Sequence, residues 1–218
     1  MRVSHMHDVA IPEALTVDPE ADDDLALRMG SMVVRFRPAR KMGRKQLERF
    51  CAQNSKLRIE QTAKGELIIM PPTFSDSGWQ NAKLTTAFMN WAEEHGGKVG
   101  DSNTGFTMPK GGMRAPDVSW LSQERYEQLP RRERKRFARI CPDFVLELRS
   151  ETDRLRTLHQ KMAEYIDNGA RLGWLIDPLE KQMFVYRPDA PVEHLLNPAT
   201  LSGDPVLAGF TLDLARVW

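Results

Sequence analysis

One segment of the chain constrains the fold more than any other, residues 143–149, which read DFVLELR. Its length and its apolar content are typical of a buried β-strand. Side chains alternate between the two faces of a strand, so Phe144, Leu146 and Leu148 share one face and Glu147 lies on the other. A carboxylate inside such an apolar run is costly unless it is paired or binds a cation. The segment therefore predicts a central strand that carries one ion-paired or functional acid.

A strand–helix–strand unit is predicted around this segment. Residues 152–168 carry apolar side chains at helical spacing, Gly169 is a suitable C-terminal stop, and residues 173–177 are the next strand. The other predicted elements are helices at 44–54 and 78–95, strands at 57–61, 66–70, 105–108, 116–121 and 182–187, and a basic helical stretch at 125–139. Helical and extended segments in this order predict an α/β fold, with a mixed β-sheet flanked by helices.

The 218 residues predict one substantial domain, residues 41–218, preceded by an N-terminal arm of residues 1–40. Residues 1–30 hold seven acids against two basic residues, and residues 31–56 hold eight basic residues against one acid. The acidic block is interpreted either as a solvated tail or as a segment that folds onto the basic residues or onto a second subunit. The basic stretch at 125–139 is either a solvated helix face or a contact for phosphates.

The formal net charge of +1 argues against a uniformly basic protein that wraps nucleic acid. Residues 31–218 nevertheless carry a net charge of +6 without the acidic arm, so the domain itself is moderately basic. The two cysteines, Cys51 and Cys141, are too few for a four-cysteine zinc site or a disulfide framework and are expected to be reduced thiols. No signal peptide is visible, and no stretch approaches the roughly 20 apolar residues of a membrane span. We expect a soluble, cytoplasmic protein.

Two acids on separate strands are the candidate metal ligands. Asp117 lies in the apolar strand 116–121 and poses the same energetic problem as Glu147. If the strands are neighbours, the two carboxylates converge and offer the oxygen ligands that Mg²⁺ or Mn²⁺ prefers. The five histidines are scattered along the chain, which disfavours zinc. Lys161 lies at the edge of the apolar stripe of its helix, beside the sheet, from where its ammonium group can reach the carboxylates or a phosphate.

Each of these residues also has an ordinary structural interpretation. An Asp after proline is often a turn or capping residue. Glu147 can pair with Arg149, which lies on the same face of the strand, and a lysine on a helix flank is usually solvated. Spacing alone leaves these alternatives open.

The sequence resembles the Uma2 family (DUF820) of the PD-(D/E)XK nuclease superfamily, which is abundant in cyanobacteria. The resemblance runs from about residue 57 to residue 218 and rests on the order Pro-Asp, Glu-x-x-Ser and Lys-x-x-x-Tyr. The supporting segments read LRIE, GELIIMPPT, DSNTGF, CPDFVLELRS, KMAEY and NGARLGWLIDP, in that order along the chain. The resemblance implies a restriction-endonuclease-like fold. It assigns the metal-binding acids to Asp117 and Glu147, the basic residue to Lys161 and an additional acid to Glu60.

Two departures from the family pattern stand out. The usual nuclease motif has Lys two residues after the Glu, where this chain has Arg149. The resemblance implies that Lys161 on the next helix takes the place of that lysine. An arginine stays charged and holds phosphates but does not act easily as a base. Relatives commonly read Ser-Pro-Ser-Asp after the strand, where residues 150–153 read SETD and place an acid near the site.

The function expected from these residues is Mg²⁺- or Mn²⁺-dependent hydrolysis of DNA phosphodiester bonds. Asp117 and Glu147 would hold the metal, with Glu60 completing the ligand set or positioning a second ion, and Lys161 would orient the attacking water or stabilise negative charge. Arg149 and Arg114 would contact the DNA backbone.

Two other functions remain open. The first is a catalytically inactive nuclease fold that binds DNA or another protein. The second is a transposase-like component that acts with a partner. A homodimer is expected because a duplex has two strands to cut. The apolar C-terminal residues 210–214 and Trp218 would cover a sheet edge or a subunit interface.

Overall fold

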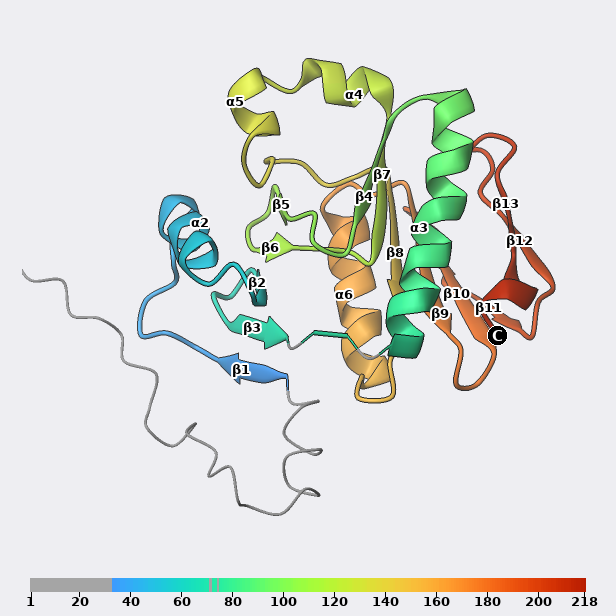
Figure 1. The fold of residues 1–218 in the computed structure, drawn as a ribbon, viewed down its shortest axis with the longest axis horizontal. Helices are drawn as coiled ribbons and strands as arrows, with labels where there is room; N and C mark the ends of the chain where they lie inside the picture. Colours follow the sequence, from blue (N-terminus) through green and yellow to red (C-terminus); the bar gives the residue numbers. More distant parts are fainter. Residues whose placement is uncertain (1–32, 71, 74) are drawn as a thin grey trace, which may run out of the picture. The chain divides into compact units, whose positions relative to one another are not determined.

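A six-stranded sheet forms the centre of the computed structural model, which describes residues 33–70, 72–73 and 75–218 (Figure 1). Its strand order is β11-β10-β9-β8-β7-β4. The strands are β4 (Lys98–Asp101), β7 (Val118–Leu121), β8 (Phe144–Leu148), β9 (Leu172–Asp177), β10 (Gln182–Tyr186) and β11 (Glu193–Leu196). Strands β8 and β9 are parallel, and every other pair of neighbours in this sheet is antiparallel. The predicted mixed sheet is therefore confirmed.

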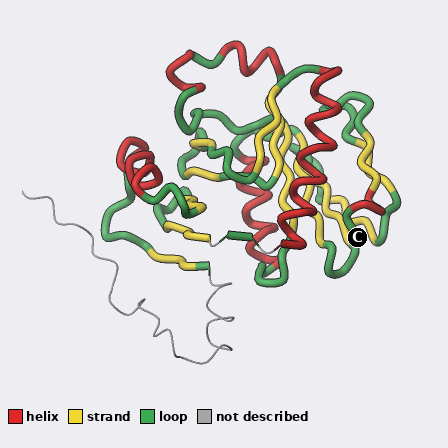
Figure 2. Tube along the Cα trace, viewed as in Figure 1, coloured by secondary structure: helices red, strands yellow, loops and turns green. Residues whose placement is uncertain are grey.

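Helices cover both faces of this sheet (Figure 2). Helix α3 (Ser75–His95) packs on one face through Leu84 and Phe88, which join Phe144 and Leu146 of β8 in one core. Helix α6 (Leu155–Asp167) connects β8 to β9 and packs on the other face. The predicted alternation of β8 is thus confirmed, because Val145 belongs to the second core and Phe144 to the first.

A smaller, five-stranded sheet has the order β1-β3-β2-β6-β5. Its strands are β1 (Val34–Phe36), β2 (Arg58–Gln61), β3 (Leu67–Met70), β5 (Phe106–Thr107) and β6 (Met113–Arg114). Strands β2 and β3 form the predicted hairpin, and Gly65 in its turn has a φ of 88°, which favours glycine. Helix α2 (Arg44–Gln53) packs on this sheet, with Leu47 in one core with Ile59 of β2.

Residue alternation gives β2 two different faces. Ile59 lies in the core under α2, whereas the neighbouring Arg58 and Glu60 contact Asp117, just before β7, and Lys161 of α6 on the other side. The hairpin therefore presents one apolar face to α2 and one charged face to the central sheet.

The remaining elements are short. The basic stretch forms two helices, α4 (Gln123–Gln128) and α5 (Arg131–Arg134), because Pro130 interrupts it. The chain ends in a two-stranded sheet of β12 (Thr200–Ser202) and β13 (Thr211–Asp213), followed by the 3₁₀ turn η2 (Leu214–Arg216). Phe210, Leu212 and Leu214 are buried in the core beneath α3. The C-terminal segment thus covers a face of the central sheet within the chain.

Most of the predicted N-terminal arm, residues 1–32, lies outside the described residues. The rest of that arm, residues 33–40, contains strand β1, which pairs with β3. The domain boundary at residue 40 stays a prediction. Both cysteines are free thiols. In the described part of the chain, no helix combines the length and the apolar content needed to cross a membrane.

Candidate active site

Asp117 immediately precedes β7, which begins two residues later than the strand predicted at 116–121, and Glu147 lies in the neighbouring antiparallel strand β8. Val118 of β7 pairs with Leu146 of β8, so the register continued by one residue places Asp117 opposite Glu147 on the same face. The Oδ2 atom of Asp117 accepts a hydrogen bond from the backbone N–H of Leu148 at 2.9 Å. Both acids are buried, with 6 % and 2 % of their surfaces exposed. The convergence that the sequence predicted for two neighbouring strands is present in the structure.

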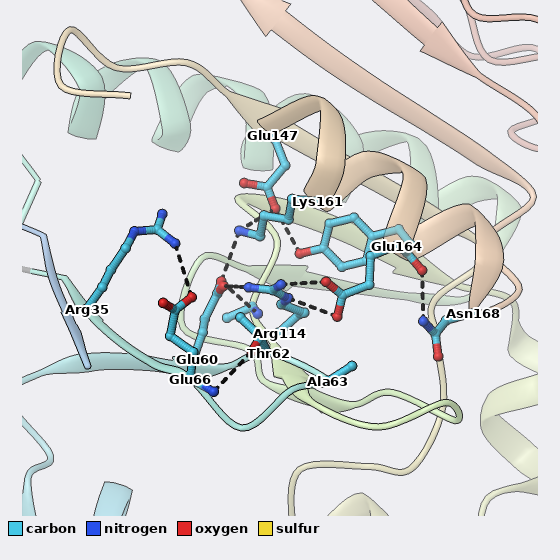
Figure 3. Close-up of polar contacts among 12 residues, drawn as sticks. Arg35, Glu60, Thr62, Ala63, Glu66, Arg114, Glu147, Lys161, Glu164 and Asn168 are labelled. Carbon is cyan, nitrogen blue, oxygen red and sulfur yellow. Dashed lines mark hydrogen bonds and ion pairs between the residues drawn. The ribbon is translucent and has the colours of Figure 1, made fainter. Parts of the chain in front are cut away.

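Lys161 joins this pair from helix α6. Its Nζ atom lies 2.7 Å from Oε1 of Glu147 and 2.9 Å from Oε1 of Glu60 on β2 (Figure 3). Only 11 % of its side chain is exposed, so the interpretation as a solvated helix-flank lysine does not apply. One ammonium group therefore connects three elements that are far apart in the sequence.

Glu60 is held from several directions. Its Oε2 atom accepts a hydrogen bond from Nη1 of Arg114 at 2.9 Å, and its Oε1 atom accepts one from the backbone N–H of Ala115 at 3.2 Å. Arg114 also donates to both carboxylate oxygens of Glu164 on α6, at 3.2 and 2.5 Å (Figure 3). These contacts leave Glu60 well satisfied by cations and donors of the chain itself, which favours a positioning role over metal ligation.

Two further residues belong to the site, although the sequence did not predict a functional role for either of them. Tyr165, fully buried, donates a hydrogen bond from its hydroxyl to Oε1 of Glu147 at 2.8 Å. Arg58 donates to Oδ1 of Asp117 at 3.1 Å and to the carbonyl of Ala115 at 2.7 Å. The sequence holds a signal for Tyr165, which lies one helical turn after Lys161. Arg58 shares a strand face with Glu60, but its contact with Asp117 depends on how the two sheets pack.

The local charges move the pKa values of the two buried glutamates in opposite directions. Burial raises the pKa of Glu147 to about 7; nearby Lys161 lowers it, and the carboxylates of Asp117 and Glu60 raise it further. Burial also raises the pKa of Glu60, but Lys161 and Arg114 outweigh this effect and bring it down to about 2. Burial lowers the pKa of Lys161, while Glu147 and Glu60 raise it more, so the ammonium form is favoured.

The two predicted DNA contacts are engaged within the chain. Arg149 lies 2.7 Å from Oδ2 of the fully buried Asp177, with 20 % of its side chain exposed. Arg114 is 7 % exposed and pairs with Glu60 and Glu164. The structure therefore pairs Glu147 with Lys161 rather than with Arg149. The roles of both arginines at DNA stay predictions.

The donor chemistry of the site fits a hard divalent cation through Asp117 and Glu147. Mg²⁺ is commonly held by one or two carboxylates while keeping several waters. Across residues 33–70, 72–73 and 75–218, no group of three His, Cys, Asp or Glu side chains gathers as a metal cage. Glu60 accordingly does not form a three-acid cage with Asp117 and Glu147. The fit of the site to a divalent cation therefore depends on Asp117 and Glu147 alone.

Comparison with known proteins agrees with this geometry. Residues 44–215 match the sequence model of the Uma2 family, described as "Putative restriction endonuclease". A similar solved structure is that of a "putative nuclease belonging to DUF820" from Anabaena variabilis, with a TM-score of 0.61 and 22 % identity, covering 73 % of this chain and 88 % of that one. No curated protein matches the chain. The family match spans most of the chain, and the chain therefore belongs to the Uma2 family, with the α/β fold of a nuclease.

Proposed function

We propose that the protein is a metal-dependent endonuclease that hydrolyses phosphodiester bonds of DNA, with Mg²⁺ or Mn²⁺ as its cofactor. The observation that carries this proposal is the placement of Lys161 2.7 Å from Glu147, on the sheet face that also carries Asp117. Two acids and one ammonium group in a buried cluster are the set of groups that phosphodiester hydrolysis needs. Membership of the Uma2 family supports a nuclease-like activity.

Asp117 and Glu147 are the residues that would hold the metal. When bound, the ion would supply Lewis acidity at the scissile phosphate and favour ionisation of the attacking water. The raised pKa of Glu147 reflects burial and excess negative charge beside it, which an added cation would relieve. The hydrogen bonds from Leu148 to Asp117 and from Tyr165 to Glu147 fix the orientation of both carboxylates.

Lys161 is proposed to orient the attacking water or to stabilise the negative charge that develops on the phosphate. Its ammonium form is favoured by Glu147 and Glu60, which suits charge stabilisation better than proton abstraction. Glu60, with Arg114 behind it, would hold the lysine in place. Arg149 stays the proposed contact for the DNA backbone because part of its guanidinium side chain is exposed.

Three further features belong to the same proposal. DNA is the proposed partner because hydrolysis at this site acts on a phosphodiester. A homodimer would allow both strands of a duplex to be cut. A cytoplasmic location is proposed because both thiols are free.

The proposal is tested with supercoiled plasmid DNA incubated with the full chain in MgCl₂ or MnCl₂. We expect nicked and linear products with the metal, none in EDTA, and none with Glu147→Gln or Asp117→Asn. Thermal unfolding of the two variants checks that they fold. Folded wild-type protein that cleaves neither plasmid DNA nor single-stranded DNA with either metal would contradict the proposal.

A catalytically inactive nuclease fold is the second candidate, and one observation favours it. Arg58 already pairs with Asp117, and Lys161 already pairs with Glu147, so the chain balances these carboxylates with its own cations. Calorimetric titration with Mn²⁺ separates the two candidates. The endonuclease requires Mn²⁺ binding that is lost in Glu147→Gln, and the inactive module requires none.

A further inference from the structure

A strongly basic surface lies outside the candidate active site. We name it the basic lobe and define it as residues 37–56, which contain α2, and residues 131–139, which contain α5. These two segments hold thirteen Lys and Arg residues against two Glu residues, a net charge of +11. The whole chain has a formal net charge of +1, so all other residues together carry −10. The excess of positive over negative charge therefore comes from the lobe alone.

Ion pairs join the two segments of the lobe into one surface. Arg44 of α2 donates to both carboxylate oxygens of Glu133 at 3.1 and 2.8 Å, and to the carbonyl of Phe137 at 2.8 Å. Arg136 pairs in return with Glu48 of α2. Both glutamate side chains are only 17 % exposed. The two acids of the lobe thus lie at the junction between the segments, where they offer little negative charge to solvent.

Several cations of the lobe are exposed and have no partner among residues 33–70, 72–73 and 75–218. Lys45 and Arg49 lie one turn apart on α2, and Arg131 and Lys135 lie at the two ends of α5. None of these four side chains makes a hydrogen bond or an ion pair with any residue that the structure describes. They are available to bind an external polyanion.

The lobe lies on the opposite face of the small sheet from the candidate active site. Leu47 of α2 packs on Ile59 of β2, whereas the neighbouring Glu60 points to Lys161. Figure 1 accordingly shows α2 on the side of β2 and β3 that faces away from α6. A molecule bound to the lobe therefore contacts a surface separate from the buried carboxylates.

We propose that the basic lobe is a docking surface for the sugar–phosphate backbone of duplex DNA. The part of the DNA that binds the lobe would be separate from the scissile bond. The choice of DNA rests on the proposed function, and the charge asymmetry favours a polyanion independently. Proteins that track single strands stack the bases on exposed aromatic side chains. The two aromatic residues within the lobe, Phe50 and Phe137, are both partly buried, which favours a duplex.

The test compares two full-length variants that lose the same number of positive charges. The lobe variant carries Lys45→Gln, Arg49→Gln, Arg131→Gln and Lys135→Gln. The control variant carries Lys64→Gln, Lys83→Gln, Arg156→Gln and Lys181→Gln, at exposed cations outside the lobe. Fluorescence anisotropy in EDTA measures the Kd of each protein for a labelled random-sequence duplex of about 20 base pairs over a series of salt concentrations.

We expect the lobe variant to bind at least about tenfold more weakly than the wild type, with the slope of log K against log salt reduced by about 3. The control variant should keep the wild-type slope and most of the affinity. Equal losses in the two variants, or no binding by the wild type, would overturn the inference.

Binding and cleavage can fail separately in these experiments. Lobe-dependent binding without plasmid cleavage would remove the proposed function and leave the inference standing. A lobe variant that cleaves plasmid DNA and binds the duplex as tightly as the control variant does would overturn the inference and leave the proposed function standing.

Discussion

Glu60 and Glu147 are both buried glutamates that contact the same lysine, yet their pKa values move in opposite directions. Glu60 has Arg114 as a second cation and a backbone donor from Ala115. Glu147 shares Lys161 with Glu60 and faces the carboxylate of Asp117. The second cation therefore determines which acid stays firmly ionised, and Glu147 is the acid that a bound cation would affect most.

The raised pKa of Glu147 predicts a particular pH dependence of stability. Its folded pKa of about 7 exceeds its ordinary value of 4.5, so the folded chain binds more protons than the unfolded chain between these values. This acid therefore lowers the free energy of unfolding as pH rises from about 4.5 through about 7. Glu147→Gln cannot ionise, so its stability relative to the wild type should improve between pH 5 and pH 8. Urea denaturation at the two pH values measures the difference, and a difference that does not change with pH contradicts the prediction.

The hydroxyl of Tyr165 gives a second prediction at this scale. Tyr165→Phe removes the donor to buried Glu147, and we expect a loss of about 1–3 kcal/mol in the free energy of unfolding. Tyr126→Phe is the matched control, because no hydrogen bond of its hydroxyl is present among the described residues and its ring contacts cations instead. Urea denaturation of both variants makes the comparison. Equal losses in the two variants would show that the Tyr165 hydrogen bond contributes nothing specific.

At the scale of elements, the β2–β3 hairpin supplies Glu60 and depends on one glycine. Gly65 has a φ of 88°, and a Cβ atom there would lie 2.9 Å from Cβ of Lys41. Gly65→Ala should therefore cost about 1–3 kcal/mol in unfolding free energy. Gly78→Ala is the control, because a Cβ atom at Gly78 in α3 meets nothing within 4 Å, and it should stabilise the protein by up to about 1 kcal/mol. Thermal unfolding measures both, and an unchanged melting temperature for Gly65→Ala refutes the strained-turn argument.

The elements that the sequence predicted are those that carry a clear apolar period. Strand β8, helix α6 and the β2–β3 hairpin all appear within a few residues of their predicted bounds. The sequence did not predict strands β6 and β4. They are only two and four residues long and include polar residues, so they show no detectable apolar period. They form because they pair with β2, β5 and β7.

Only part of the candidate site could be predicted from the sequence, namely the positions that follow from side-chain alternation along a strand and from the phase of a helix. Alternation placed Glu147 on the face of β8 opposite to Phe144, and helical phase placed Lys161 beside the sheet. The contacts of Arg114 and Arg58 were not predictable, because they depend on how the small sheet packs against the central one. Such long-range pairs leave no spacing in a single sequence.

At the scale of the whole molecule, the near-neutral net charge conceals a separation of charge. The sequence showed two basic segments, but only the ion pairs between α2 and α5 reveal that they form one surface. The candidate active site, by contrast, combines carboxylates with cations in a buried cluster. Binding of DNA and hydrolysis of DNA are therefore expected to depend on different residues.

The central claim is that Asp117 and Glu147 hold a divalent cation beside Lys161. The most direct measurement is an anomalous difference map from a crystal of the full chain soaked in Mn²⁺. We predict a peak about 2 Å from a carboxylate oxygen of each acid, with the Lys161 ammonium beside it. A crystal in which Mn²⁺ binds elsewhere or nowhere, and in which Lys161 and Arg58 keep their ion pairs with Glu147 and Asp117, would contradict the claim.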